Sequence, residues 1–386
     1  MDFPSDKRSQ FSIPVLVLLS ALSLSVYAPI ISVINNPRIF RQRNVIQTVD
    51  KMAGMVPITE ILRDPNFIKF SNQLKNMTSP PFIIFFDSGN LNIFLNHICN
   101  LEFYPGSVSR LAAVSFDQNA TLALAQKYPA IPTVLVDLEP MKAFLPTNHE
   151  NRNYILYQLI LLVRTRICAL LARQNINFWA MQQDTIWFED VNKLAIEQLY
   201  PNAHLIFDTV GNDQLPQYVL RMHDWVCGST FFVRGSPTTF QFFQQVDSFT
   251  RSHQSPDSTI MTYLCGHQGY RCQRLPKTMF SNSDYFRGTR EAVPAMIQMD
   301  FNSKDGTKME MFEKLRFRLR NDNGTCDKNA FLNLRNSVQL ALPERIEKNP
   351  VYKETTWQRV KYWLKKLFNV DPFNNKVFLT VHYSLV

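Results

Sequence analysis

The stretch Ile176-Asn-Phe-Trp-Ala-Met-Gln-Gln-Asp-Thr-Ile-Trp-Phe-Glu-Asp190 decides the fold that the sequence predicts. It begins as an apolar, aromatic run typical of a buried strand and passes without a break into Gln182, Gln183 and Asp184. With a period of two, Gln182 and Asp184 are expected on the same side of the strand end. Since ligands of open α/β sheets bind at the carboxyl ends of strands, Asp184 stands where a substrate would bind.

The surrounding pattern is that of an α/β protein. Residues 154–173 carry apolar side chains on nearly every turn of a predicted helix, which leads into the stretch above. Several other apolar runs also end on an acid, namely residues 82–87, 111–117, 133–137 and 204–208. Segments of helix length separate the first three of these runs. We therefore predict a mostly parallel, doubly wound sheet within a domain of residues 81–340.

Composition is that of a globular protein and gives no sign of a nucleic-acid partner. The 386 residues are 45% hydrophobic and include 30 Phe but only 11 Gly. The formal net charge is +9, from 41 Lys and Arg against 32 Asp and Glu. These basic residues are scattered and no nucleic-acid motif accompanies them, so the charge is only compatible with a phosphate-bearing ligand.

An uncharged segment near the N-terminus predicts a membrane anchor. Residues 11–34 contain no charged side chain in 24 positions, a length that spans the hydrocarbon core of a bilayer. A cleaved signal peptide is the alternative, because Val26-Tyr27-Ala28 resembles a cleavage site, but Pro29 would follow the cut. The predicted organisation is a cytosolic tail (1–10), an anchor (11–34), a stem (35–80), the domain (81–340) and a basic C-terminal extension (341–386).

Glycosylation sequons and cysteines bear on the compartment. Asn76, Asn119 and Asn323 each begin an Asn-x-Thr triplet on the same side of the predicted anchor, which favours a lumenal domain. The six cysteines show no zinc-type pairing, and Cys265 with Cys272 is the closest candidate disulfide. Cys168 lies in the apolar helix and is expected to be a buried thiol.

The order of motifs resembles the nucleotide-diphospho-sugar transferase family that includes the plant-type xylosyl- and arabinosyltransferases. The resemblance covers about residues 80–320 and rests on Asp184-Thr-Ile-Trp187, Cys227-Gly228, Pro256-Asp257 and Leu275-Pro276-Lys277. It implies a type II Golgi membrane enzyme with its catalytic part in the lumen. Such an enzyme moves a sugar from a nucleotide diphosphate to a glycan or protein acceptor, with retention of anomeric configuration.

The resemblance also implies a divalent cation, manganese or magnesium, held by an Asp-x-Asp motif. Such an ion neutralises the charge of the departing diphosphate as a Lewis acid. Here Gln182 replaces the first acid, and a neutral carbonyl binds an ion more weakly. Either Asp184 binds the ion with help, for which Asp300 is the candidate, or fixed cations replace it. The cations available for phosphate contact are Arg164, Arg234, Lys277 and Lys308.

Two motif residues have a structural reading beside the functional one. Asp257 precedes Ser258 and Thr259 and has the position of a helix N-cap; the resemblance places it on the acceptor side as a catalytic candidate. Gly228 either lets the backbone approach the donor or marks a β-bulge. Asp184 itself has the position of a turn or cap residue as well as that of a metal or diphosphate ligand.

Two other functions compete with the transferase. A transferase-like module that lost catalysis and only binds or regulates is favoured by Gln182 and Gln298. A lipid-facing structural protein is favoured by the anchor and by a basic amphipathic pattern at residues 357–368. Deleting residues 1–34 would abolish the function of the structural protein but leave a transferase soluble and active.

Overall fold

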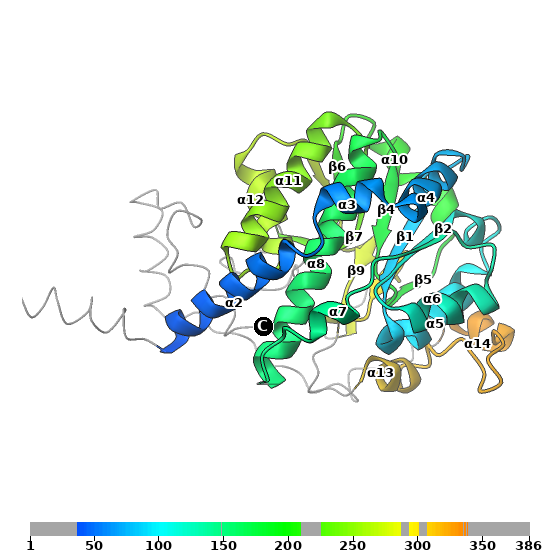
Figure 1. The fold of residues 1–386 in the computed structure, drawn as a ribbon. Helices are drawn as coiled ribbons and strands as arrows, with labels where there is room; N and C mark the ends of the chain where they lie inside the picture. Colours follow the sequence, from blue (N-terminus) through cyan, green and yellow to red (C-terminus); the bar gives the residue numbers. More distant parts are fainter. Residues whose placement is uncertain are drawn as a thin grey trace, which may run out of the picture.

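A twisted seven-stranded sheet forms the centre of the protein (Figure 1). The structure is a computed structural model that describes residues 37–147, 149–209, 225–286, 293–300, 307–334, 336 and 338. The strands are β1 (Phe82–Phe86), β2 (Leu111–Ser115), β3 (Thr133–Leu135), β4 (Phe178–Met181), β6 (Leu205–Thr209), β7 (Val226–Val233) and β8 (Cys272–Arg274), in the order β3-β2-β1-β4-β7-β6-β8. All neighbours pair in parallel except β7, which is antiparallel to β4 and β6.

Helices cover both faces of this sheet, because its strands are apolar on both sides. Along β1, Ile83 and Phe85 pack into one buried cluster while Phe82, Ile84 and Phe86 pack into another. The first cluster contains buried residues of α2 (Pro37–Ala53), α3 (Ile58–Arg63), α4 (Pro65–Lys75), α8 (His149–Arg173), α11 (Pro237–Ser252) and α12 (Asp257–His267). The second contains those of α5 (Leu91–Leu101), α6 (Gln118–Lys127), α9 (Val191–Leu194) and α10 (Ile196–Leu199). The predicted mixed α/β class with a mostly parallel sheet is confirmed.

A smaller sheet and the last helices complete the described part of the chain. Its order is β5 (Thr185–Trp187), β10 (Met296–Gln298) and β9 (Phe280–Ser281). The remaining elements are α7 (Glu139–Lys142), α13 (Lys308–Lys314), α14 (Lys328–Leu332) and the 3-10 turns η1 (Ser88–Asn90), η2 (Val108–Arg110) and η4 (Ser283–Phe286). Buried side chains of β5, β10 and α13 form a third apolar cluster. This cluster, which also contains Ile93 and Cys99 of α5, attaches α13 to the smaller sheet and to α5.

The sequence predicted one strand that ends at Gln182 to Asp184, whereas the structure divides residues 176–190 between two strands of different sheets. β4 ends at Met181, and β5 begins at Thr185 in the smaller sheet, where Thr185 pairs with Gln298. The three polar residues between them form a turn, in which the Thr185 hydroxyl donates to the Gln182 carbonyl at 3.0 Å. A strand buried on both faces cannot continue through three polar side chains, because their groups would lose water. The turn therefore places Asp184 between the two sheets.

Residues predicted as a membrane-proximal stem pack into the domain from Val45 onward. Val49 and Met52 of α2 and Phe67 and Phe70 of α4 are almost fully buried in the first apolar cluster. The weak helical patterns of this segment gave little sign of that packing. The predicted tail (1–10), anchor (11–34) and C-terminal extension (341–386) lie outside the described residues.

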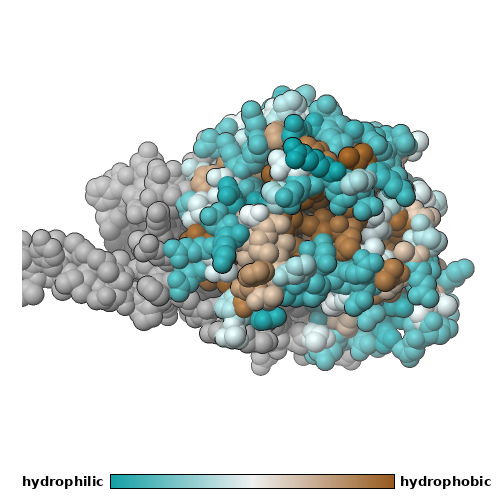
Figure 2. Space-filling view, viewed as in Figure 1, coloured by the Kyte–Doolittle hydropathy of each residue, from teal (hydrophilic) through white to brown (hydrophobic). Residues whose placement is uncertain are grey.

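The apolar helix α8 belongs to the core. Its residues 152–173 form the one described helix that is long and apolar enough to cross a membrane, and 83% of its most apolar window is buried in the protein. Its packing partners are α11 and α2, which lie beside it in Figure 1. Figure 2 shows a strip of apolar side chains reaching the surface on the face that carries α8.

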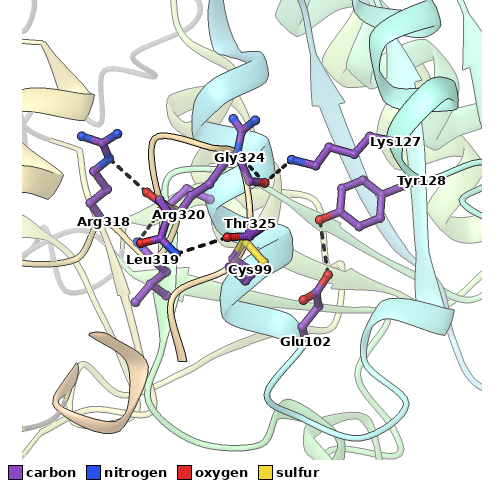
Figure 3. Close-up of a disulfide and its surroundings, with 12 residues drawn as sticks. Cys99, Glu102, Lys127, Tyr128, Arg318, Leu319, Arg320, Gly324 and Thr325 are labelled. Atoms are coloured by element: carbon purple, nitrogen blue, oxygen red, sulfur yellow. Dashed lines mark hydrogen bonds between the residues drawn. A yellow bond between two sulfur atoms is a disulfide. The ribbon is translucent and has the colours of Figure 1, made fainter. Parts of the chain in front are cut away.

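Two disulfides fasten segments of the chain. The predicted pair Cys265–Cys272 is confirmed, and Cys99 of α5 is bonded to Cys326 across 227 positions (Figure 3). Around the second bond, the Lys127 ammonium donates to the Gly324 carbonyl, as Figure 3 shows. Cys168 and Cys227 are free, and Cys168 is buried as expected.

We predict that the two disulfides differ in their contribution to stability. A cross-link lowers the entropy of the unfolded chain more when it closes a longer loop, which gives about 5 kcal/mol for Cys99–Cys326 and about 2.5 kcal/mol for Cys265–Cys272. Replacing Cys99 and Cys326 by Ala should therefore lower the free energy of unfolding about twice as much as replacing the other pair. Urea denaturation of the two double variants measures this, and equal losses would contradict the prediction.

Candidate functional site

The order of the large sheet defines a crevice at one edge. From β1 the chain goes to β2 on one side, whereas β4 pairs with β1 on the other side, so the direction of winding reverses between β1 and β4. Ligands of such sheets bind outside the carboxyl ends of the strands at this reversal. Asp87 follows β1 there, and Gln182 to Asp184 follow β4. In Figure 1 this edge faces α5, α6 and α13.

A polar pocket lies at the carboxyl ends of β1, β2 and β3. Its volume is about 300 Å³, and it is lined by Asp87, Ser88, Gly89, Asp117, Gln118, Asn119, Asp137, Glu139 and Lys142. The backbone N–H of Ser88 donates to Asp117 at 2.7 Å, and that of Ala120 donates to it at 2.8 Å. Burial opposes ionisation of Asp117, but hydrogen bonds from Ser88 and Ala120 outweigh it and hold its pKa below the usual value. Asp117 therefore gives the pocket a negatively charged side chain, which is hydrogen-bonded to the first turns of η1 and α6.

Asp184 stands beyond the end of β4 and is almost fully buried, with 2% of its surface exposed. Its Oδ2 accepts a hydrogen bond from the Lys308 ammonium, while its Oδ1 is buried without a hydrogen-bond partner among the described residues. Its backbone carbonyl accepts from the N–H of Met299 at 2.7 Å. The predicted position of Asp184 at the mouth of the sheet agrees with the structure; its role stays a prediction.

His97 of α5 contacts Thr185, the residue that follows this acid. Its Nδ1 is 3.1 Å from the Thr185 carbonyl, and its Nε2 is buried without a hydrogen-bond partner among the described residues. Burial lowers the pKa of His97 to about 4, although the contact with Thr185 and the charge of Asp184 oppose that shift. The imidazole is therefore neutral at physiological pH and donates its Nδ1 proton to the carbonyl.

Lys308 is the cation that the fold brings to Asp184. Burial disfavours the charged form of Lys308, but the charge and hydrogen bond of Asp184, with the charge of Asp300, raise its pKa above the usual value. The side chain of Lys308 remains 40% exposed while that of Asp184 is 3% exposed. The pair thus presents a charged ammonium at the surface of the crevice.

The two glutamines of the site form one hydrogen-bonded chain. The Gln298 side-chain amide donates to Gln182 Oε1 at 2.7 Å, and the Cys227 thiol donates to Gln298 Oε1 at 3.1 Å. Burial and the charge of Asp208 raise the pKa of Cys227 well above its ordinary value, so it is a neutral thiol. Gln182 is thus held by a neutral partner.

These groups do not make a fitting donor set for a divalent cation. A magnesium site is usually made of one or two carboxylates together with substrate phosphates and water, in octahedral geometry. Asp184 Oδ2 and Gln182 Oε1 already accept hydrogen bonds, and Asp300 Oδ1 accepts the Ser283 N–H at 2.9 Å. Asp184 Oδ1 has no hydrogen-bond partner among the described residues, but one carboxylate oxygen does not make a metal site. Within the described ranges no three His, Cys, Asp or Glu side chains are grouped closely enough to bind a metal.

Asp257 and Arg164 form a buried ion pair close to β7. The Arg164 guanidinium donates to Asp257 and, at 2.9 Å, to the carbonyl of Gly228. Both side chains are 6% exposed, so Arg164 is occupied by internal partners rather than free for a phosphate. Asp257 is the first residue of α12 and Pro256 occupies the N-cap position, so the N-cap interpretation of Asp257 is wrong. The two residues join α8, α12 and β7.

Gly228 lies against α12 in a β-bulge. Its φ of +68° is in the left-handed region, and a Cβ built there would stand 2.6 Å from Met261 Cε. The register of β6 and β7 shifts at this point, between the pairs Phe207–Phe231 and Thr209–Val226. The bulge reading of Gly228 is therefore confirmed, and the close approach it permits is to the helix.

The other predicted residues are spread over the protein. Lys277 follows β8, and it is half-buried. Arg234 follows the antiparallel β7 at the opposite edge, where it donates to the Ala203 and Glu197 carbonyls, both at 3.1 Å. The sequon residues Asn76, Asn119 and Asn323 are all exposed.

Asp208 at the end of β6 is a carboxyl to which the sequence assigned no role. It is 4% exposed, and it accepts hydrogen bonds from the Ser229 hydroxyl and, at 3.2 Å, from the Thr230 N–H. Burial raises its pKa to about 7, against the opposing effect of the Ser229 hydrogen bond. The only sequence signal was an apolar strand ending on an acid, which Asp208 shares with Asp87 and Asp137.

We predict that Asp208 makes the protein less stable as pH rises. Its folded pKa of about 7 exceeds the usual 3.8, so the folded state binds more protons and the free energy of unfolding falls from about pH 4 to pH 7. At about 1.4 kcal/mol per pKa unit, the loss is at most about 4 kcal/mol. Asp208→Asn should flatten this part of the pH profile in urea denaturation, whereas an unchanged slope would contradict the assignment.

Several solved structures are similar to this chain. The bifunctional glycosyltransferase WbbM matches with 13% identity and a TM-score of 0.40 over 75% of this chain, which spans about half (52%) of WbbM. The galactosyltransferase LgtC, in complex with donor and acceptor sugar analogues, matches with 10% identity and a TM-score of 0.39, covering 73% of this chain and 99% of LgtC. Mouse xyloside xylosyltransferase 1 matches with 11% identity and a TM-score of 0.36, covering 57% and 97%.

No curated protein sequence matched the chain. The family model for nucleotide-diphospho-sugar transferases matches residues 106–312, more than half of the 386 residues, and includes β4, Asp184 and the start of α13. The chain therefore belongs to the nucleotide-diphospho-sugar transferase family.

Proposed function

We propose that this protein is a glycosyltransferase that moves a sugar from a nucleotide diphosphate donor to a hydroxyl group of a glycan or protein acceptor. The observation that carries this proposal is the shared edge of the sheet: the polar pocket follows β1, β2 and β3, and the Asp184–Lys308 pair follows β4, which pairs in parallel with β1. A nucleoside fits the pocket of about 300 Å³, near the lower limit of ligand sites. The diphosphate then reaches the reversal between β1 and β4.

The reaction follows from this placement. The bond between the anomeric carbon and the diphosphate oxygen breaks, and the acceptor oxygen bonds to the same carbon. With retention, as the family resemblance implies, both events take place on one face of the sugar, and the departing diphosphate oxygen takes the acceptor proton. Charge accumulates on that oxygen, so a positive group beside it stabilises the transition state. Lys308 supplies such a group at the crevice.

We propose structural roles for two residues that the sequence marked as candidates. The Arg164–Asp257 pair fixes the start of α12 beside the bulge at Gly228. Removing either partner would leave a buried charge, which destabilises a protein strongly. These residues position the wall of the site and do not touch the donor in this account.

A binding or regulatory module without catalysis is the second candidate. It is favoured by the chain of hydrogen bonds from Cys227 through Gln298 to Gln182, which replaces the acid of the family motif with neutral groups. In that case the protein would bind nucleotide sugars without releasing nucleoside diphosphate. Binding and turnover therefore distinguish the two functions.

We further propose that the domain is lumenal and anchored through residues 11–34. Two disulfides support an oxidising compartment, since such bonds are rare in the cytosol. The exposed sequons at Asn76 and Asn323 are compatible with glycosylation. A type II Golgi membrane location follows from the family resemblance together with this compartment.

We predict that Asp184→Asn abolishes turnover. The purified full-length chain, incubated with a panel of nucleotide diphosphate sugars, should release nucleoside diphosphate, and the variant should do so at least about 100-fold more slowly because Lys308 loses its fixed partner. Asp50→Asn, which removes an exposed carboxylate paired with Arg251 at 3.1 Å, is the control and should retain full activity. Unchanged turnover in Asp184→Asn would refute the assignment. Donor binding without turnover in the native chain would support the binding module.

We predict that Asn119 carries no glycan in the active protein. Asn119 lines the polar pocket, so a glycan on it would obstruct the proposed nucleoside site, whereas Asn76 and Asn323 lie outside the pocket lining. Glycopeptide mass spectrometry of the chain from secretory cells should find occupancy at Asn76 or Asn323 and none at Asn119. Full occupancy of Asn119 in a chain that binds nucleotide would contradict the location of the pocket.

A further inference from the structure

We propose that the Lys308 ammonium is the resident cation of this site and excludes a divalent metal ion from Asp184. This inference rests on the proposed function, because it specifies how the site would hold a diphosphate. It departs from the metal dependence that the family resemblance implies. Its observational basis is the ion pair between Lys308 Nζ and Asp184 Oδ2, which joins residues 124 positions apart.

The backbone of α13 fixes where this ammonium lies. Thr307 caps the helix: its hydroxyl accepts the Glu310 N–H at 3.2 Å, and the Glu310 carboxylate accepts the Thr307 N–H at 2.7 Å. Lys308 is therefore held as the first residue of the helix. Met311 and Phe312, three and four positions on, are buried at 5% and 1% exposure in the cluster with β5 and β10. Because β5 directly follows Asp184, the packing of α13 on β5 positions Lys308 and Asp184 together.

The remaining oxygen atoms of the motif are not arranged for a metal. Gln182 Oε1 accepts from Gln298, and Gln298 Oε1 accepts from Cys227. Asp300 Oδ1 accepts from the backbone of Ser283. A divalent ion at the unpaired Oδ1 of Asp184 would be repelled by the adjacent Lys308 ammonium, and recruiting Gln182 or Asp300 as further ligands would break part of this network.

Lys308 can meet a diphosphate without leaving Asp184. An ammonium has three N–H donors, and Asp184 accepts one of them. The side chain is 40% exposed, so donors remain for phosphate oxygen atoms. The negative charge of Asp184 offsets the positive charge of Lys308. Hydrogen bonds, rather than long-range attraction, are therefore the main contribution of Lys308 to diphosphate binding. Such charge-assisted hydrogen bonds to phosphate are short and strong.

Manganese binding tests the exclusion of metal directly. The purified full-length chain is titrated with Mn²⁺, and the electron paramagnetic resonance signal of the free ion reports binding. The native chain and Lys308→Arg should bind no Mn²⁺ below about 1 mM, whereas Lys308→Met should bind it at least tenfold more tightly because Asp184 and Asp300 are then unopposed. Lys314→Met removes an exposed lysine from the same helix and should behave as the native chain does. Circular dichroism confirms that each variant is folded.

Inorganic pyrophosphate tests the role of the ammonium. In EDTA, calorimetry should detect its binding to the native chain, and the affinity should fall at least tenfold in Lys308→Met but by less than threefold in Lys308→Arg. Lys314→Met is again the control. Neither readout depends on turnover.

Each result decides a separate point. Tight Mn²⁺ binding by the native chain, no gain of Mn²⁺ binding in Lys308→Met, or pyrophosphate binding that requires Mn²⁺ would overturn the inference. Pyrophosphate affinity that is unchanged in Lys308→Met would overturn it as well. Failure of pyrophosphate to bind the native chain with or without Mn²⁺ would instead contradict the proposed donor site. The inference and the proposed function can thus fail separately.

Discussion

The pairing of β4 with β1 on one side and β7 on the other is the constraint on which the site depends. Parallel pairing with β1 puts the ends of both strands at one edge, and the direction of winding reverses between them, which is where ligands of such sheets bind. Antiparallel pairing with β7 brings the start of β7, with Cys227, to the same edge. One set of backbone hydrogen bonds therefore brings distant polar groups together.

The smaller sheet supports the helix that carries the cation Lys308. β4 and β5 are separated only by the turn of Gln182 to Asp184, so the turn is fixed at both ends by different sheets. α13 packs on the smaller sheet through Met311 and Phe312 and places Lys308 against Asp184. The burial of apolar side chains in α13 and the smaller sheet thus stabilises an arrangement in which the buried Asp184 has an oppositely charged partner.

The sequence predicted what depends on local pattern. Apolar runs ending on acids located β1, β2, β3 and β6, and they placed Asp184 at an edge of the sheet. The short spacing of Cys265 and Cys272 identified one disulfide. These features lie within one strand or one turn, where side-chain periodicity and chain geometry decide the outcome.

The sequence could not predict contacts between distant segments. Lys308 was one of four possible cations, and nothing local distinguished it from Arg164, whose charge the fold directs to Asp257 instead. The links from Gln298 to Gln182 and from Cys99 to Cys326 join residues 116 and 227 positions apart. The packing of α2 and α4 was missed because short, mixed segments acquire their core position from the helices they meet, such as α8.

A crystal structure of the full chain with a nucleoside diphosphate, grown in EDTA, tests the central claim most directly. We predict the nucleoside in the pocket near Asp87 and Asn119, and the diphosphate at the crevice within hydrogen-bonding distance of Lys308. A nucleotide bound away from the carboxyl edge of β1 and β4, with this crevice empty, would contradict it.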